Sequence, residues 1–345
     1  MKLNDAATPS CNNPQPAEQG AQMRFAITGV LLACATQFFV PGVLAQQYPS
    51  RTIRYIVPFA PGGTTDILGR IVAQGLSQTL GQQVIVDNRP GQAGSLGAAE
   101  LARAAPDGHT LGGGTISSHA INVSLYSKLP YDALKDFSPI TMLATQPNML
   151  VVHATLPARN VKEFIVLAKS RPNQLNFGSA GSGTSQHISG ELFKTLTGVR
   201  MQHVPYKGSG QMIPDLLAGY VELSFENIAT AYPHAKAGKL RALAVTSAKR
   251  SFVAPEVPTM QEAGVPGYDI SSWQAMFAPA NTPPAILNRL NTEVNNLLRS
   301  AETQKRFRDL GLETGGGPAS DLAEVIRKDI PRLGKIVRES GAKVD

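Results

Sequence analysis

The sequence predicts an α/β protein with mostly parallel sheets, and three observations support this class. Strand-like runs alternate with helix-like runs along most of the chain, a pattern typical of strands joined by crossover helices. Two of the strands run directly into glycine-rich turns that open helices, at VPFAPGGTTD and at NFGSAGSGTS. The 345 residues, of which 42% are hydrophobic, are enough for about two domains with separate cores.

The alternation can be followed element by element. The first predicted helix carries apolar residues at about 3.6-residue spacing, and Gly81 stands where a C-terminal cap belongs. We expect strands at residues 53–57, 84–86, 149–152, 175–177, 202–204, 221–225 and 240–246. We expect helices at residues 66–80, 96–104, 161–170, 185–196, 212–218, 283–299 and 320–340.

The first 45 residues predict export. Residues 1–22 are polar and are interpreted as a disordered leader, and Met23-Arg24 then precede the apolar run FAITGVLLACATQFFV. A positive start, an apolar centre and a small-residue cleavage site at Ala45 define a secretory signal peptide. Met23 is an alternative translation start. Cys34 is an alternative lipoprotein site, which the apolar run continuing beyond it disfavours.

Composition argues against several other classes. Both cysteines precede the predicted cleavage site, so the mature chain depends on core burial rather than on disulfides. The formal net charge is +7, with Lys249-Arg250 and the KRFR run at 305–308 as the densest basic runs, and this scatter argues against a nucleic-acid partner. The six histidines show no metal-ligand spacing, and we therefore expect neither a metal nor a cofactor.

The two glycine-rich turns predict an anion site. The start of a helix exposes unpaired N–H groups and roughly half a positive charge, and glycine lets an anion approach them closely. Neither a Walker sequence nor a dinucleotide fingerprint is present, so a carboxylate is a more natural ligand than a phosphate. The alternative is that both are ordinary turns, capped by Thr and Ser, that bind no ligand. The residues placed to act in this way are Gly62, Gly63, Thr64, Thr65, Gly181, Ser182, Gly183 and Thr184.

Three further residues have open roles. Asp66 lies in a first helical turn, where it either complements the helix dipole or holds a ligand's ammonium group, and the first role is favoured. His187 follows the second glycine turn and is kept as a candidate. Ser95 in AGSLG approximates a nucleophile elbow, but its first glycine is replaced and no acid and histidine follow recognisably. An exported serine hydrolase using Ser95 is therefore the alternative function.

The chain resembles the Bug family of periplasmic solute-binding proteins, which are associated with tripartite tricarboxylate transporters. The resemblance covers nearly all of residues 48–345 and rests on many blocks in order, among them TIRYIVPFAPGGTTD, VIVDNRPGQAGSLGA, LNFGSAGSGTSQHISGELF, HVPYKGSG and WQAMFAPANTPP. It implies a type II periplasmic binding protein, with two α/β lobes, two crossover connections and a ligand cleft between the lobes. The implied lobes are 46–146 with 269–345, and 147–268; a single continuous domain is the alternative.

The resemblance also implies a function and a set of contacts. We expect a periplasmic, non-enzymatic protein that binds a dicarboxylate, tricarboxylate, aromatic acid or acidic amino acid. Its partner would be a membrane permease, which some family members lack, and the protein itself would be a monomer. Ser95, Ser224 and Glu226 depart from the family's usual residues and leave the ligand's identity open. The implied ligand-binding residues are Phe59, Gly62, Gly63, Thr64, Thr65, Asp66, Ser117, Ser118, Ser179, Gly181, Ser182, Gly183, Thr184, His187, Tyr206, Lys207 and Asn227.

Overall fold

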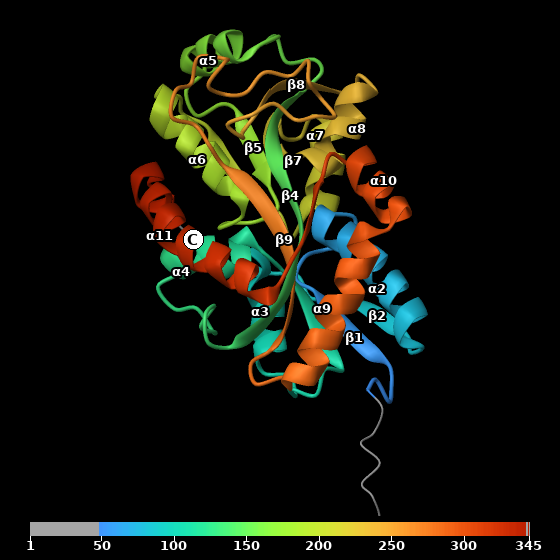
Figure 1. Cartoon of the computed structure of the whole chain (residues 1–345). Helices are drawn as coiled ribbons and strands as arrows, with labels where there is room; N and C mark the ends of the chain where they lie inside the picture. The colour runs from blue at the N-terminus through green and yellow to red at the C-terminus, as the bar shows by residue number, and fades with distance from the viewer. Residues whose placement is uncertain (1–47, 343, 345) are drawn as a thin grey trace, which may run out of the picture. The chain divides into compact units, whose positions relative to one another are not determined.

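Residues 48–342 and 344, which the computed structural model describes, fold around one ten-stranded sheet (Figure 1). The predicted leader and signal peptide lie outside these residues. The strands are β1 Ile53–Val57, β2 Val84–Asn88, β3 Thr110–Thr115, β4 Phe137–His153, β5 Asn176–Ser179, β6 Gln202–Pro205, β7 Leu223–Asn227, β8 Leu240–Val245, β9 Ser271–Pro279 and β10 Glu313–Gly316. Their hydrogen-bonded order is β2-β1-β3-β9-β4-β7-β5-β6, and β8 and β10 also pair with β4.

Strand β4 belongs to two groups of strands. Up to Pro147 it pairs antiparallel with β9, and its first half also pairs with β10. From Asn148 onward it pairs antiparallel with β7, and from Met149 with β8. We call β1, β2, β3, β9 and β10 the first strand group, and β5, β6, β7 and β8 the second strand group. β4 therefore connects the two groups along a single stretch of backbone.

The expectation of mostly parallel sheets is wrong, because the sheet is mixed. β1 pairs parallel with β2 and β3, and β5 pairs parallel with β6 and β7. The pairings of β4 and the β3–β9 pair are antiparallel. Alternation along the sequence reports chain neighbours, whereas β9 comes from a distant part of the chain and inserts between β3 and β4.

The helices pack against the sheet from both sides. In Figure 1, α6 and α11 lie on one side, and α2, α9 and α10 lie on the other. The helices are α2 Thr64–Leu80, α3 Ser95–Ala102, α4 Asn122–Leu125, α5 Val161–Ser170, α6 Ser185–Thr197, α7 Ser209–Ala218, α8 Ile228–Lys236, α9 Pro284–Arg299, α10 Ala301–Asp309 and α11 Ala319–Ser340. Two short turns, η1 Gln92–Gly94 and the π-helical η2 Ser117–Ile121, complete the fold. Among the helices of the described residues, none has both the length and the apolar character needed to cross a bilayer.

The ends of the two glycine-opened helices follow from local sequence. α2 begins after Gly63 without a side-chain cap and ends at Gly81, whose φ of 69° is left-handed and suits glycine. α6 begins after Thr184, whose hydroxyl accepts a hydrogen bond from the backbone N–H of His187, and ends at Gly198 with φ 71°. Both predicted helices and both predicted C-terminal glycines are confirmed.

Some elements were not predicted, for identifiable reasons. Strand β3 reads TLGGGT and lacks an apolar pattern, because neighbouring side chains occupy the space where side chains would stand. A Cβ at Gly114 would lie 2.5 Å from ring carbons of both His119 and Phe277. These buried rings stack at 4.0 Å and form part of the apolar core. Glycine is therefore required for this close packing rather than for a turn.

Candidate functional site

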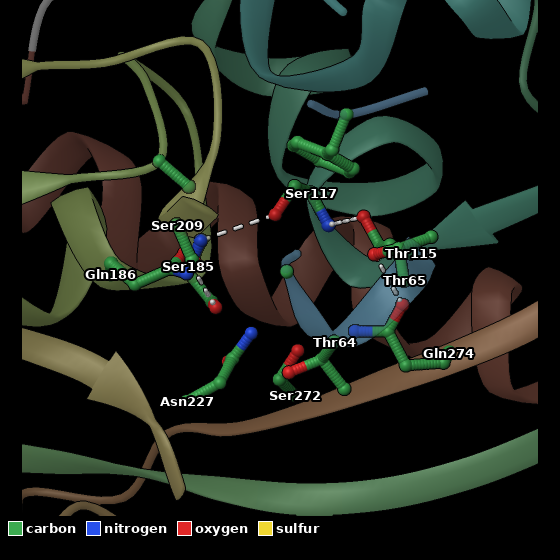
Figure 2. A pocket seen from close by; sticks show the side chains of 13 residues that line it. Thr64, Thr65, Thr115, Ser117, Ser185, Gln186, Ser209, Asn227, Ser272 and Gln274 are labelled. Atoms are coloured by element: carbon green, nitrogen blue, oxygen red, sulfur yellow. Dashed lines mark hydrogen bonds between the residues drawn. The ribbon is translucent and has the colours of Figure 1, made fainter. Parts of the chain in front are cut away.

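The described residues contain a small cavity where four helices begin (Figure 2). Thr64 and Thr65 open α2, Ser185 and Gln186 open α6, Ser209 opens α7, and Asn227 precedes α8. We call this space the inner cavity; its volume is about 20 Å³, enough for about one water molecule. Its lining residues are Phe59, Gly63, Thr64, Thr65, Thr115, Ser117, Ala180, Ser185, Gln186, Ser209, Asn227, Ser272 and Gln274.

The inner cavity is polar without being charged. Its lining residues carry hydroxyls and amides, and none of them has an ionisable carboxyl, amino or guanidinium group. Positive potential comes instead from the helix starts, each of which contributes roughly half an elementary charge through its unpaired N–H groups. Such a site suits an anion that accepts several hydrogen bonds.

Hydrogen bonds among the lining residues orient their donors. Thr115 Oγ1 accepts bonds from the backbone N–H groups of Ser117 at 3.2 Å and Ser118 at 3.4 Å, so its own hydroxyl hydrogen is available for another acceptor. Thr65 donates to Gln274 Oε1 at 2.9 Å, which leaves the amide NH₂ of Gln274 as a donor (Figure 2). The lining is thereby set up to donate to a ligand oxygen.

A larger groove adjoins the inner cavity, since Phe59 and Ala180 line both. We call it the adjoining groove; its volume is about 230 Å³. Tyr126 crosses it by donating its hydroxyl to the backbone oxygen of Ser182 at 2.9 Å. The groove is lined by Phe59, Gly91, Gln92, Ala93, Gly94, Tyr126, Ala180, Gly181, Ser182, Pro205, Tyr206, Lys207 and Val344.

The structure places some of the expected contact residues in the inner cavity, some in the adjoining groove and some in neither space. The inner cavity receives Phe59, Gly63, Thr64, Thr65, Ser117 and Asn227. The adjoining groove receives Phe59, Gly181, Ser182, Tyr206 and Lys207. The remaining residues line neither space: Gly62, Asp66, Ser118, Ser179, Gly183, Thr184 and His187.

Sequence reasoning missed several residues of the inner cavity. Ser209 follows a glycine at a helix start, as in the two turns that were singled out, so its signal was present in KGSG. Ser272 and Gln274 lie on alternate positions of β9, and nothing in their local sequence indicates a site. The other residues not predicted are Thr115, Ala180, Ser185 and Gln186.

Asp66 is occupied by donors of the protein itself. Its carboxylate accepts bonds from the backbone N–H of Gly62 at 3.0 Å, from Arg70 at 2.9 and 3.0 Å, and from Asn88 at 2.9 Å. Burial acts to raise the pKa of Asp66, but these hydrogen bonds outweigh it and hold the pKa below its usual range. The arrangement favours the structural role, in which Asp66 anchors the turn that opens α2.

His187 lies behind the second glycine turn. Its Nδ1 accepts a hydrogen bond from the backbone N–H of Gly183 at 3.1 Å, and its ring stacks on that of His203 at 4.1 Å. Burial, aided by the charge of Lys194, lowers the pKa of His187 to about 4. The ring is therefore neutral at pH 7 and positions the turn through an acceptor nitrogen.

Ser95 does not have the surroundings of a nucleophile. It is fully buried, and its hydroxyl accepts bonds from Asn122 Nδ2 at 2.9 Å and from the hydroxyl of Tyr131 at 3.4 Å. Within the described part of the chain, no histidine or carboxylate bonds to it. The serine-hydrolase alternative is therefore not supported. In the same residues, no group of histidine, cysteine, aspartate or glutamate side chains is arranged to hold a metal ion.

The mixed α/β sheet and the uncharged cavity at four helix starts are typical of a solute-binding protein. Residues 68–342 match the family described as the tripartite tricarboxylate transporter family receptor, TctC. The chain belongs to this TctC/Bug family, whose members are periplasmic substrate-binding receptors.

Individual relatives agree with this assignment. Protein BugT of Bordetella pertussis is 37% identical over 320 residues, which are 92% of this chain and 98% of that protein. The structure of Rpa4515 from R. palustris with adipate has a TM-score of 0.84 and 41% identity, and the match covers 86% of this chain and 100% of that one. MatC from Rhodopseudomonas palustris with bound malate has a TM-score of 0.81 and 34% identity, with 84% and 100% covered.

Proposed function

We propose that this chain is an exported, non-enzymatic protein that captures a small carboxylate for uptake by a tripartite tricarboxylate transporter. The observation that carries the proposal is the convergence of the starts of α2, α6, α7 and α8 on the inner cavity. A carboxylate offers two oxygens that accept several hydrogen bonds, and the helix starts supply both donors and positive potential.

The expected strength of such a site is sufficient for a transport receptor. A hydrogen bond to a charged group contributes roughly 1.5–3 kcal/mol. Three or four such bonds, less the cost of ordering the ligand, approach the roughly 8 kcal/mol of a micromolar complex. No cationic side chain is needed in the cavity itself.

The two spaces together suggest a dicarboxylate. The inner cavity, with room for about one water molecule, would have to widen slightly to take a single carboxylate group, so the rest of the ligand would extend into the adjoining groove. Lys207 in that groove can meet a second carboxylate, and Tyr206 can flank the carbon chain. Adipate and malate, bound by the two related structures, both have this form.

Binding would be coupled to closure of two lobes, residues 46–146 with 269–345 and residues 147–268. Loops of the two strand groups already contact each other, through Ser185 N to Ser117 Oγ at 3.1 Å and Ala60 N to Lys207 O at 3.2 Å. A ligand held from both sides favours this arrangement, and a permease can distinguish it from an open one. We expect the binding protein to act as a monomer.

A charge introduced into the cavity tests the proposal. Gln274→Glu places a carboxylate among the donors, and we expect the affinity for adipate or malate, measured by calorimetry, to fall at least about a hundredfold. Gln304→Glu, which adds the same charge at an exposed helix position, should bind as the wild type does. Equal affinity of Gln274→Glu and wild type would contradict the anion site. Ligand recovered with unchanged mass would support a non-enzymatic role.

A further inference from the structure

Glu226 is a carboxylate buried beside the inner cavity. It is the fourth residue of β7 and has no exposed surface. Its Oε1 accepts hydrogen bonds from Ser209 Oγ at 2.7 Å, Thr230 Oγ1 at 2.8 Å and the backbone N–H of Asn227 at 2.9 Å. Gln186 Nε2 lies at 3.5 Å from the same oxygen. Oε2, in contrast, has no hydrogen-bond partner among the described residues.

The donors to Glu226 are also walls of the binding site. Ser209, Asn227 and Gln186 all line the inner cavity, where they stand at the starts of α7, α8 and α6. One layer of polar groups therefore separates the Glu226 carboxylate from the space proposed for the ligand carboxylate. Two negative charges at such short range oppose each other strongly in a buried environment.

No basic side chain among the described residues neutralises this pair of charges. No lysine, arginine or histidine forms an ion pair with Glu226 in the described part of the chain. The elements packed on β7 carry the following titratable groups: His153 on β4, His187, Glu191 and Lys194 on α6, Asp215 on α7, and Tyr232, His234 and Lys236 on α8, while β5 carries none. Lys194 is paired with Glu191 at 2.9 Å, and His187 is neutral at pH 7.

Opposing effects act on the protonation of Glu226, and burial is the largest of them. Burial holds the pKa of Glu226 above its usual range, and the hydrogen bonds from Ser209, Thr230, Asn227 and Gln186 offset this only in part. In the empty site the helix starts also favour the ionised form. A ligand carboxylate in the inner cavity adds a like charge and shifts the balance toward the neutral acid.

We propose that Glu226 takes up a proton from solvent when a carboxylate enters the inner cavity, so that the protein binds the anion together with a proton. The proton forms an O–H bond at Oε2, because Oε1 already accepts several hydrogen bonds. The inference rests on the proposed carboxylate function. It makes Glu226 a positioning and charge-compensating residue rather than a direct ligand contact.

Proton uptake has a measurable consequence for affinity. Where Glu226 is ionised in the empty protein, carboxylate affinity falls as the pH rises, by up to about tenfold per pH unit. Replacement of Glu226 by glutamine keeps an oxygen acceptor for Ser209 and Thr230 and removes the charge. We therefore expect Glu226→Gln to bind a carboxylate at least as tightly as the wild type, with a flatter pH profile.

Calorimetry in two buffers counts the proton directly. Adipate and malate are titrated into the full-length mature protein at pH 7, in PIPES and in Tris, whose ionisation enthalpies differ. We expect the wild-type binding enthalpy to depend on the buffer with a slope that approaches one proton taken up, and the Glu226→Gln slope to vanish. The control is Glu191→Gln, which alters a different buried carboxylate, one that lies on α6. This variant should keep the wild-type slope.

Two results would overturn the proposal: wild-type binding with no proton uptake, or an unchanged slope in Glu226→Gln. If neither adipate nor malate binds, that result contradicts the proposed function and not the proton step. A measurement without ligand then tests the proton step. Because an ionised buried Glu226 destabilises the fold, the gain in melting temperature of Glu226→Gln should grow between about pH 5 and about pH 8. A gain that does not change with pH shows that Glu226 does not titrate there and rejects the proposal.

Discussion

A Cβ atom on Gly210 would lie 1.9 Å from the backbone carbonyl oxygen of Pro61. Pro61 belongs to the loop that opens α2, and Gly210 is the second residue of α7, so the two helix starts meet backbone to backbone. Gly62 and Gly208 extend the same contact, because a Cβ on either would lie close to the facing loop. The inner cavity lies beside this contact, since Gly63 and Ser209 both line it. The contact between the loop that opens α2 and the start of α7 therefore closes the inner cavity on this side.

Gly210→Ala should weaken ligand binding without unfolding the protein. The added methyl group meets a backbone oxygen, which cannot move aside as a flexible side chain can, so the two loops must separate. We expect the affinity for adipate or malate to fall at least about tenfold, as measured by calorimetry. Gln211→Ala, at the exposed neighbouring position, should bind normally. Wild-type affinity in Gly210→Ala would show that the contact is not part of the bound state.

Ser117→Ala should reduce both affinity and stability modestly. Ser117 Oγ accepts the backbone N–H of Ser185 at 3.1 Å and also lines the inner cavity. Loss of the Ser117 hydroxyl removes one hydrogen bond, which lowers the stability by about 1 kcal/mol. It also removes one donor to the ligand, so we expect carboxylate affinity to drop about fivefold to tenfold. Thermal melting and calorimetry measure the two effects. Ser124→Ala, at an exposed position, provides the baseline, and equal values for both variants would contradict the role given to Ser117.

Asp66→Asn distinguishes the two roles considered for Asp66. As an anchor of the α2 turn, the carboxylate is held by Arg70, Gly62 and Asn88, and an amide in its place cannot accept all of these bonds. We expect a loss of about 2 kcal/mol in the free energy of unfolding, measured by urea denaturation. If Asp66 instead held a ligand's ammonium group, the variant would lose binding of acidic amino acids alone and keep its stability.

The pH dependence of stability should carry a contribution from His187. Burial lowers the pKa of His187 from about 6.5 to about 4. At a pH between these two values, the unfolded chain binds the proton and the folded protein does not. Stability from this group is therefore present at neutral pH and is lost as the pH falls from about 6.5 to about 4, by roughly 3 kcal/mol.

A variant that cannot titrate isolates this contribution. His187→Asn offers a side-chain oxygen to the backbone N–H of Gly183 without binding a proton. We expect its unfolding free energy to depend less on pH than that of the wild type below about pH 6.5. Because the ring of His203 stacks on His187 and has its own pKa lowered to about 3 by burial, His203→Asn is the companion measurement. Parallel wild-type and His187→Asn curves would contradict the argument.

The sequence by itself determined the local elements of this protein. Periodic apolar residues and glycine caps predicted α2 and α6 nearly to their ends, because helix starts and stops depend on residues a few positions apart. The same local signal predicted that Gly63, Thr64 and Thr65 stand at a helix start beside a binding site, and they line the inner cavity; the signal was equally available at Ser209. The sequence blocks shared with the Bug family also place the chain among carboxylate receptors.

Only the tertiary structure decided which helix starts meet and what lies behind them. Ser272 and Gln274 enter the inner cavity because β9 inserts between β3 and β4 in an antiparallel direction, which no local pattern encodes. The pairing of β7 with the distant strand β4, which sets Glu226 opposite Met149, places Glu226 behind three of the cavity's walls. Its Oε2 has no hydrogen-bond partner among the described residues. Chemistry that depends on contacts between distant segments follows from packing, and packing is a property of the whole fold.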